Sequence, residues 1–515
     1  MSNSRGLVLG MARARVGPAA AFIDGARGLV AACEENRLTR ARYAPPPGPP
    51  ALARAELLAF LERSASDVSA VGVVDDDNNI EWADGGVSAT SVDGHQAHAA
   101  YALLASGFRS GLVLVSEVHK SRGWTAWQFD GDRQSPREVG EALGHFPLAK
   151  IYGQLTQAMG FQPMRDEHLV EAMARSGSPA NTEAADLIKL TDRGVVVDAS
   201  FEDVVRRAAT STDPDRATRD VAASIQKRLG ECLVELLTRI AALDSARGPA
   251  ENLCLSGGLF FNTFFTTAAA TCGIFQRVYV PPHPGRNGTA LGAALIAGGS
   301  GLVTAGAIGS PYLGPGYSDG QIKEALDNCK LSYDFVQGDR LNDAVIHGLV
   351  RGRLVGWFHG RLEWGPRALG HRSVLASPFA PHVLENLNGF LKRRPWYRSY
   401  GVSVPRSQVE NLFETPASKA SPFMQFEYRP RDPDKFRTIL PRGVETLRVH
   451  TVDENEPRFL HLLEMWGQKT GTPVLVNTSF NGFHEPLVCS PRDAIRVFYG
   501  TGLDILALGD FFLRK

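Results

Sequence analysis

The chain has 515 residues, enough for two or three domains that each bury a core of their own. Its 55 lysine and arginine residues balance its 55 aspartate and glutamate residues, so no overall field would attract nucleic acid or an acidic membrane surface. No apolar run is long enough for a membrane span or a signal peptide, which predicts a soluble, cytoplasmic protein. The six cysteines lack CxxC pairs and indicate neither a disulfide framework nor a thiolate zinc site.

Short apolar segments predict strands near the start of the chain. Segments 7–9, 20–23 and 29–32 alternate with turns, a rhythm that predicts a meander at the edge of a sheet. Segments 71–74 and 111–115 are apolar and β-branched with polar residues at their ends, which is typical of buried strands. The first part of the chain therefore contains sheet as well as helix.

Helices are predicted where apolar residues recur at helical spacing. Residues 51–63 form an amphipathic pattern directly after the stiff, proline-rich stretch 45–50. Residues 217–243 carry a long apolar stripe that predicts a core-facing helix, followed by a strand at 252–255. Packing in a core explains this stripe without a functional role.

A glycine-rich stretch at 299–316 predicts a domain boundary near residue 313. Beyond the boundary, we expect a helix at 319–328, a strand at 354–358, a helix through 385–391 and an α/β ending. The chain is therefore divided into segments 1–313 and 314–515.

Three segments of the second part carry an unusual concentration of cationic and amide side chains. The first, RLEWGPRALGHRS at 361–373, follows the predicted strand at 354–358 and combines three arginines with residues that break regular structure. The others are KRRPWYR at 392–398 and NTSFN at 477–481. Because guanidinium groups suit phosphate and carboxylate, these segments predict an anionic substrate. The alternative is a solvated, arginine-rich face.

Together these segments resemble the GR-E-GPRALG-RS, K-RE-R and NTSFN runs in the C-terminal, YrdC-like domain of carbamoyltransferases that modify antibiotics and nodulation factors. LSGG at 255–258 with Asn262, and GTALG at 288–292, resemble glycine-rich signatures of that family's N-terminal, TsaD-like domain. The resemblance implies a two-domain α/β protein. An actin-like ATPase-type, TsaD-like transfer domain would occupy 1–313, and a YrdC-like, adenylate-forming domain would occupy 314–515.

The resemblance also implies a reaction. The second domain would form a carbamoyl adenylate from ATP and carbamoyl phosphate, and the first would pass the carbamoyl group to a small-molecule acceptor. The catalytic positions carried over are Arg367, Lys392, Arg398 and Ser479. The implied substrate- or nucleotide-binding positions are Arg372, Asn477, Asn481, Gly257, Gly258, Asn262 and Gly288.

These residue types suit adenylation. The transition state spreads negative charge over phosphate oxygens, and fixed cations stabilise that charge. Glycine-rich turns bring backbone N–H groups close to nucleotide phosphates. ATP is the expected cofactor, and Mg²⁺ could accompany it. One departure predicts a different pocket wall, since residues 398–403 read RSYGVS where the family usually has RPFAPS.

The TsaD-like domains of the family hold a divalent, iron-type metal, whose ligands are missing from this sequence. Gly94 replaces the first histidine of the HxxxH pair, so only His98 remains. Glu117 follows a serine where an aspartate is expected after the strand at 111–115, and Arg286 replaces the aspartate of GDxGT. The sequence therefore predicts no metal at this position.

Other positions of the first domain also depart from the family. Val16 and Gly17 replace a His-Asp pair, and the run 166–177 differs from the usual GExKxMGLAPxG. A replacement metal site would draw on His95, His98, Glu117 and His119. We favour the alternative that His95 and His98 are hydrogen-bonded remnants.

The loss of the metal bears on the acceptor. An alcohol, with a pKa of roughly 16, needs a metal or a strong base before it attacks a carbonyl at neutral pH. An amine acceptor is therefore expected, or a base such as Glu117, His98 or Glu171 in place of the metal.

Two other functions are compatible with the sequence. One is a homologue that transfers nothing itself and scaffolds or feeds a partner carbamoyltransferase. The other is an amide-forming ligase that activates another small carboxylate. The protein could form a homo-oligomer or a heteromer with a carbamoyltransferase homologue, and neither nucleic acid nor a membrane is an expected partner.

Overall fold

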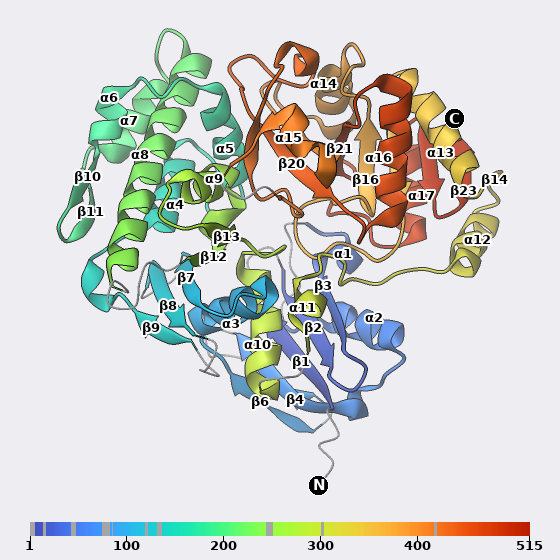
Figure 1. The fold of residues 1–515 in the computed structure, drawn as a ribbon, viewed down its shortest axis with the longest axis horizontal. Coiled ribbons are helices and arrows are strands. Elements are labelled where there is room, and N and C mark those ends of the chain that lie inside the picture. Colours follow the sequence, from blue (N-terminus) through green and yellow to red (C-terminus); the bar gives the residue numbers. More distant parts are fainter. Residues whose placement is uncertain are drawn as a thin grey trace.

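The computed structural model of the protein describes residues 6–13, 17–42, 48–74, 83–84, 86–118, 122–130, 136–243, 251–299, 303–416 and 420–515. Two sheets lie in the first half of the chain and a ten-stranded sheet lies in the second half (Figure 1). Helices cover these sheets, so the predicted mixed α/β class is confirmed.

The first sheet begins with an antiparallel meander and continues with parallel strands. Its strand order is β3-β2-β1-β4-β6-β5. The strands are β1 (Leu7–Ala12), β2 (Ala19–Asp24), β3 (Leu29–Glu34), β4 (Val68–Val74), β5 (Ala83–Asp84) and β6 (Val87–Ser91). β1, β2 and β3 pair antiparallel, whereas β4 runs parallel to both β1 and β6. The meander predicted at the sheet edge is confirmed.

The second sheet repeats this topology. Its strands are β7 (Gly111–Ser116), β8 (Trp124–Phe129), β9 (Arg137–Val139), β12 (Asn252–Ser256) and β13 (Arg277–Tyr279). β7, β8 and β9 pair antiparallel, and β12 runs parallel to β7 and β13, in the order β9-β8-β7-β12-β13. Apart from the additional edge strand β5, the two sheets have the same order and directions. This is the arrangement of an actin-like ATPase-type fold, which confirms the predicted fold class.

Two helices lie between these sheets and approach them closely. They are α3 (Gly94–Ser106) and α10 (Thr289–Gly298). A Cβ on Gly10 of β1 would lie 1.9 Å from the carbonyl oxygen of Ala290, and one on Gly292 would lie 1.9 Å from that of Ala97. Glycine at these positions therefore allows α10 to pack against β1 and α3. Gly292 of the GTALG segment has this packing role.

The predicted long helix is α8 (Pro214–Ala242). It begins three residues earlier than predicted because the Asp213 side chain caps it, accepting from the N–H of Arg216 at 3.2 Å. Alternate residues of β7 face opposite sides: Leu112 and Leu114 share a core cluster with α8, whereas their neighbours pack against α3. The helix α5 (Glu167–Ser176) packs against α8 and lies beside the second half of the chain.

The ten-stranded sheet forms the frame of the second half. In sheet order its strands are β14 (Asp334–Phe335), β23 (Phe511–Arg514), β22 (Ile505–Leu508), β15 (Val355–Phe358), β16 (Arg372–Ala376), β21 (Leu475–Ser479), β17 (Gly401–Pro405), β20 (Leu447–Val452), β19 (Glu427–Pro430) and β18 (Phe413–Glu414). Helices α13 (Asp339–Val350) and α16 (Pro457–Thr470) share a core cluster with the middle of the sheet. The strand predicted at 354–358 and the helix α12 (Asp319–Asn328) are both confirmed.

The helix predicted at 385–391 has an unusual form. A short α14 (Val383–Glu385) continues as a π-helix, Asn386–Lys392, which ends at Arg393 with φ 47°. π-helical turns are rare and occur frequently at functional sites. Here the turn determines where the side chain of Lys392 emerges.

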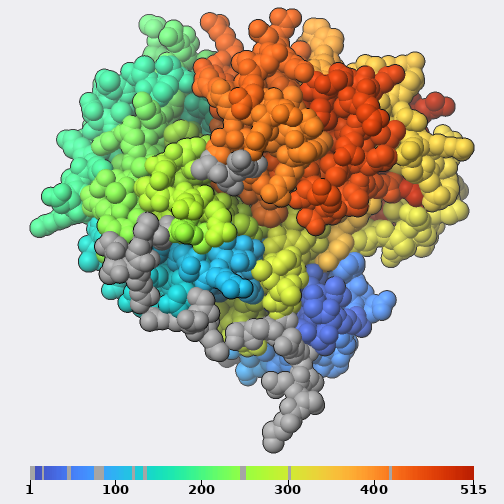
Figure 2. All heavy atoms as spheres, in the orientation of Figure 1, coloured from blue at the N-terminus to red at the C-terminus, as the bar shows by residue number. Residues whose placement is uncertain are grey.

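The two halves of the chain are joined by polar contacts as well as by packing. The guanidinium of Arg361 donates to the carbonyl oxygens of Val30, Leu313 and Gly314 at 2.6–3.0 Å. The space-filling view shows the green segment around α8 and α9 (Thr263–Thr271) abutting the orange segment around β19 and β20 (Figure 2). The domain boundary near residue 313 stays a prediction. Among the described helices, none combines the length and apolar character required to cross a membrane.

Candidate functional site

The segment 361–373, here called the arginine loop, connects β15 to β16 and is held by one buried carboxylate. Oε1 of Glu363 accepts hydrogen bonds of 2.9 Å from the backbone N–H groups of Leu369, His371 and Arg372. Three charge-assisted hydrogen bonds to one oxygen fix the path of the loop. Glu363 therefore positions the arginines through its Oε1 atom.

The three arginines of this loop point to different places. Arg361 joins the two halves, as described above. Arg372 is fully buried, donates to the carbonyl oxygens of His359 at 2.7 Å and Gly360 at 3.1 Å, and lies 3.6 Å above the ring of Phe358. Arg367 alone of the three reaches the interface with the first half, where it donates to the carbonyl oxygen of Phe261 at 2.8 Å.

The contacts of Arg372 predict a structural role for it. Replacing Arg372 with methionine should lower the free energy of unfolding by roughly 3 kcal/mol or more, because it removes the hydrogen bonds of a fully buried guanidinium to main-chain carbonyl oxygens. Urea denaturation would measure the change. Arg351→Met, at an exposed position, is the matched control and should stay within about 0.5 kcal/mol of wild type. Equal stability of the two variants would contradict the structural role.

Lys392, Ser479 and Asn481 lie together. The ammonium of Lys392 donates to the carbonyl oxygens of Ser479 at 2.5 Å and Asn481 at 3.1 Å, and to Oδ1 of Asn481 at 2.6 Å. The hydroxyl of Ser479 donates to the same Oδ1 at 2.8 Å. All three ammonium protons are thus engaged by neutral acceptors. Burial, with the charges of Arg394 and Arg42, lowers the pKa of Lys392 well below its ordinary value.

Arg398 lies close to this group and contacts the first half. Its guanidinium donates to the carbonyl oxygen of His168 in α5, and the side chain is 7% exposed. Burial, with the charges of Arg394 and Arg448, lowers the pKa of Arg398 to about 9, so it is still protonated at neutral pH. Asn477 is placed elsewhere. Its amide donates to the hydroxyl of Ser403 at 2.9 Å inside the sheet.

Four arginines converge where the halves meet, and we call them the interface arginine cluster: Arg175, Arg367, Arg398 and Arg448. They surround Glu171 of α5. Burial alone would raise the pKa of Glu171, but the charges of these four arginines lower it below its ordinary value. The sequence analysis missed Arg175 and Arg448. One signal was available, since Arg448 and His450 share one face of an otherwise apolar strand.

The glycine-rich residues of the first half lie at the end of β12. Gly257 has φ +105°, and a Cβ there would lie 2.1 Å from the carbonyl oxygen of Ser116. The N–H of Gly258 donates to Oε2 of Glu117 at 2.9 Å. A Cβ on Gly288 would lie 2.1 Å from the carbonyl oxygen of His283. Glycine is thus required for close packing at Gly257 and Gly288.

Asn262 lies among buried polar side chains rather than beside these glycines. Its Oδ1 caps α9 by accepting from the N–H of Phe264 at 3.0 Å. Its amide donates to Gln226 at 2.7 Å and to the hydroxyl of Tyr152 at 3.1 Å. These contacts engage both the oxygen and the nitrogen of the Asn262 side-chain amide. The binding roles of Asn262, Gly257, Gly258 and Gly288 stay predictions.

The residues that the resemblance aligns with the family's metal ligands form a polar cluster. Nε2 of His98 lies 3.3 Å from Oε2 of Glu117, and Nδ1 of His98 lies 2.9 Å from the hydroxyl oxygen of Ser256. Burial alone would raise the pKa of Glu117, but His98, Arg286 and the N–H of Gly258 lower it. A Cβ on Gly94 would lie 2.9 Å from Nη1 of Arg286, so this guanidinium takes the space of a side chain at position 94.

A divalent metal does not fit this cluster, because a fixed cation already lies beside Glu117. In the part of the chain that the structure describes, no group of three or more His, Cys, Asp or Glu side chains could hold a metal ion. His95 forms a 2.9 Å hydrogen bond with Thr125. His119 and Val16 lie outside the described residues.

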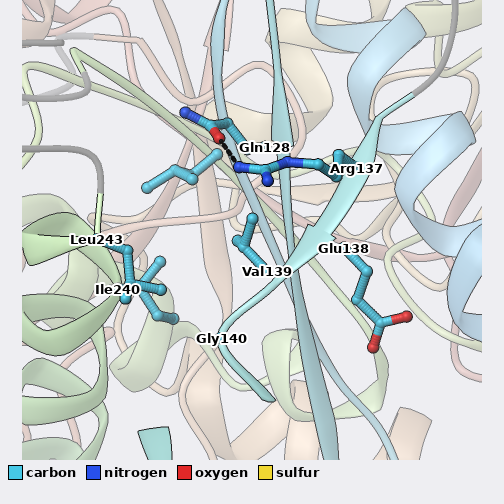
Figure 3. A pocket seen from close by; sticks show the side chains of 8 residues that line it. Gln128, Arg137, Glu138, Val139, Gly140, Ile240 and Leu243 are labelled. Atoms are coloured by element: carbon cyan, nitrogen blue, oxygen red, sulfur yellow. Dashed lines mark hydrogen bonds between the residues drawn. The ribbon is translucent and has the colours of Figure 1, made fainter. Parts of the chain in front are cut away.

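A surface pocket in the first half lies away from the candidate site. This pocket of about 270 Å³ lies at the edge of the second sheet, where Arg137 donates to Gln128 at 2.9 Å and Leu243 forms part of the wall (Figure 3). None of the predicted site residues lines it. The cationic side chains instead lie buried between the two halves.

A domain with two similar sheets is joined to a domain with a ten-stranded sheet, and buried cationic side chains lie between them. Two family models match the chain. One described as the N-terminus of carbamoyltransferases matches residues 86–295, and one described as their C-terminus matches residues 346–515. The chain belongs to the carbamoyltransferase family and is a transferase of that type.

Relatives extend over most of the chain. Uncharacterized protein sll1178 of Synechocystis sp. is 30% identical over 484 residues, which cover 82% of this chain and 75% of that protein. Nodulation protein NolO of Bradyrhizobium diazoefficiens is 29% identical and covers 82% of this chain and 78% of its own length. Among solved structures, T. kodakarensis HypF covers 56% of this chain and 47% of its own, with 13% identity and a TM-score of 0.35.

Proposed function

We propose that this carbamoyltransferase activates carbamoyl phosphate with ATP in its second half and transfers the carbamoyl group in its first half. With water, carbamoyl phosphate and ATP would give carbamoyl adenylate, phosphate and pyrophosphate. A TsaD-like transfer domain would then pass the carbamoyl group to a small-molecule acceptor. The similarity to nodulation proteins supports an acceptor of natural-product type, including those of antibiotic biosynthesis.

The observation that carries the proposal is the meeting of three distant segments at a buried, cationic site. Lys392 is bound to Ser479 and Asn481, and Arg367 and Arg398 lie at the same interface with carbonyl rather than carboxylate partners. Their charges therefore remain available for phosphate oxygens. Arg367 and Arg398 would stabilise the charge that develops on the phosphate groups, and Ser479 would offer a hydrogen bond.

Lys392 has a different part in this proposal. Because its three donors are engaged by the segment after β21, it would orient Ser479 and contribute positive charge without binding phosphate directly. ATP would bring Mg²⁺ with its phosphates. The magnesium would neutralise part of their charge.

We also propose that transfer in the first half proceeds without the iron-type metal of the family. The Arg286 guanidinium lies where a metal ligand would have to stand, and Glu117 is already paired with His98. Without a metal to acidify an alcohol, an amine acceptor is favoured, because its lone pair is available at neutral pH. If the acceptor is a hydroxyl, His98 with Glu117 is the base that the described residues offer at this place.

The first test is pyrophosphate release from ATP by the full-length protein, with and without carbamoyl phosphate. Release that depends on carbamoyl phosphate is expected, and no acceptor is needed to observe it. Acetate in place of carbamoyl phosphate is the control for the amide-ligase alternative. Pyrophosphate release with acetate but not with carbamoyl phosphate would show that the donor is not carbamoyl phosphate. No pyrophosphate release with any donor would contradict adenylation by this chain acting by itself.

A further inference from the structure

The interface arginine cluster is assembled from both halves of the chain. Arg175 comes from α5, whereas Arg367, Arg398 and Arg448 come from the arginine loop, the segment after the π-helix, and β20. All four interact with Glu171 at the interface. Arg175 donates to the carbonyl oxygen of Thr446 at 2.7 Å, and Figure 1 shows α5 beside the strands that carry this segment.

Two carboxylates lie in the cluster and do not balance it. The hydroxyl of Thr263 lies 3.1 Å from Oε1 of Glu171 and 2.6 Å from Oε1 of Glu427, so both acids lie beside the same side chain. Nε of Arg175 lies 3.5 Å from Glu427. Four guanidinium groups against two carboxylates leave two positive charges in excess within a largely buried interface.

Pairing in the cluster is also incomplete. Among the described residues, Arg367, Arg398 and Arg448 form no ion pair with a carboxylate. Four buried guanidinium nitrogens lack a hydrogen-bond acceptor: Nε and Nη1 of Arg175, Nε of Arg398 and Nε of Arg448. Buried charges are normally paired and buried donors normally hydrogen-bonded, so this combination requires an anion that the protein itself does not supply.

The number of unmatched charges and donors indicates the chemistry of that anion. An excess of two positive charges is neutralised by a dianion, and several convergent guanidinium N–H groups match an oxyanion with several acceptor oxygens. Phosphate has both properties. A monocarboxylate would leave one charge unbalanced.

We propose that the interface arginine cluster binds a doubly charged, phosphate-type oxyanion, and that Arg175 of α5 is one of its ligands. The proposal rests on the proposed function for the source of that anion, which is the phosphate group of carbamoyl phosphate or the pyrophosphate end of ATP. It adds a residue of the first half to the activation site. The anion would then join the two halves, because neither half supplies all the ligands.

Isothermal titration of the full-length protein with inorganic phosphate, pyrophosphate and carbamoyl phosphate tests this proposal. Arg175→Gln should weaken the binding of the correct anion by about tenfold or more, because it removes a charge and a directed donor. Arg206→Gln, which removes an exposed arginine of α7 (Phe201–Ala208) in the same half, is the matched control and should leave binding unchanged. If Arg175→Gln binds phosphate and carbamoyl phosphate more weakly, the anion in the cluster is the phosphate group of carbamoyl phosphate. If it binds only pyrophosphate more weakly, the anion is the pyrophosphate end of ATP.

Glu171→Gln supplies a second test that does not depend on the stability of the arginine variant. It removes a negative charge beside the anion and keeps the shape of the side chain, so phosphate binding should become tighter. An arginine cluster with a purely structural role would not give tighter phosphate binding in Glu171→Gln together with weaker binding in Arg175→Gln. Wild-type protein that binds none of the three anions at millimolar concentration, or anion binding unchanged in both variants, would overturn the proposal.

The outcomes also separate this inference from the proposed function. Anion binding that weakens in Arg175→Gln, in a protein that releases no pyrophosphate, would support the site and contradict adenylation. Carbamoyl-phosphate-dependent pyrophosphate release, with an unchanged KM for carbamoyl phosphate in Arg175→Gln, would support adenylation and contradict the role of Arg175.

Discussion

Arg367→Gln should reduce carbamoyl-phosphate-dependent pyrophosphate release by about 10²–10³-fold, the loss typical of removing one fixed electrostatic donor from an active site. Arg367 is the residue of the arginine loop that reaches the interface, and a carbonyl oxygen is its hydrogen-bond partner there. Burial, with the charge of Arg448, lowers the pKa of Arg367 to about 9, so the side chain is charged at neutral pH. Glutamine keeps a donor but loses the charge.

Steady-state kinetics of pyrophosphate release would measure this effect. The matched control is Arg353→Gln, because Arg353 belongs to the same half, is 59% exposed and pairs with Asp504 at the surface. The control should keep wild-type kinetics. Thermal unfolding of both variants shows whether Arg367→Gln is folded, since only a folded variant reports on catalysis. A folded Arg367→Gln with near wild-type release would remove Arg367 from the proposed activation site.

Much of the local structure was predictable from sequence because it depends on local patterns. The apolar stripe of α8 and the serine cap of α12 act over a few turns, so their positions follow from periodicity and capping. The actin-like ATPase-type fold was expected from the resemblance, but the strand order of the first two sheets does not follow from local patterns. It depends on which strands pair across long connections, as when β4 pairs with β1 and β12 pairs with β7, and no internal similarity of sequence marks it.

The composition of the candidate site was predictable in part. The resemblance identified Lys392, Ser479 and Asn481, which the structure brings together. It gave Arg367 a catalytic role and Arg372 a binding role, but one points into the interface and the other is engaged by main-chain carbonyl oxygens. Sequence order cannot distinguish them, because the direction of each side chain follows from how Glu363 holds the loop.

The residues that the first half contributes to the candidate site were harder still to predict from the sequence. Arg175 lies in a run that departs from the family pattern, so resemblance offers no role for it. Its importance arises from proximity to Arg448 and Glu427, which are more than 250 residues away in sequence. Such a contact is a property of the interface between the halves and is visible only once their packing is known.

The double substitution Gly94→His with Arg286→Asp should convert the first half into a metal-binding protein. Removing the Arg286 guanidinium frees the space beside position 94, where Nη1 would lie 2.9 Å from a Cβ. The introduced imidazole and carboxylate would join His98 and Glu117, which already lie 3.3 Å apart. Two imidazoles and two carboxylates are a suitable donor set for a divalent transition metal.

Metal content after incubation with Fe²⁺ or Zn²⁺ and desalting measures the result, by elemental analysis of the full-length protein. We expect about one metal ion per chain in the double variant and none in wild type. The two single substitutions are the controls. Gly94→His alone clashes with the guanidinium and should be destabilised, and Arg286→Asp alone places two carboxylates together without a cation. Stoichiometric metal in wild type would contradict metal-free transfer, because it would show that the Arg286 guanidinium does not exclude a metal ion from this position.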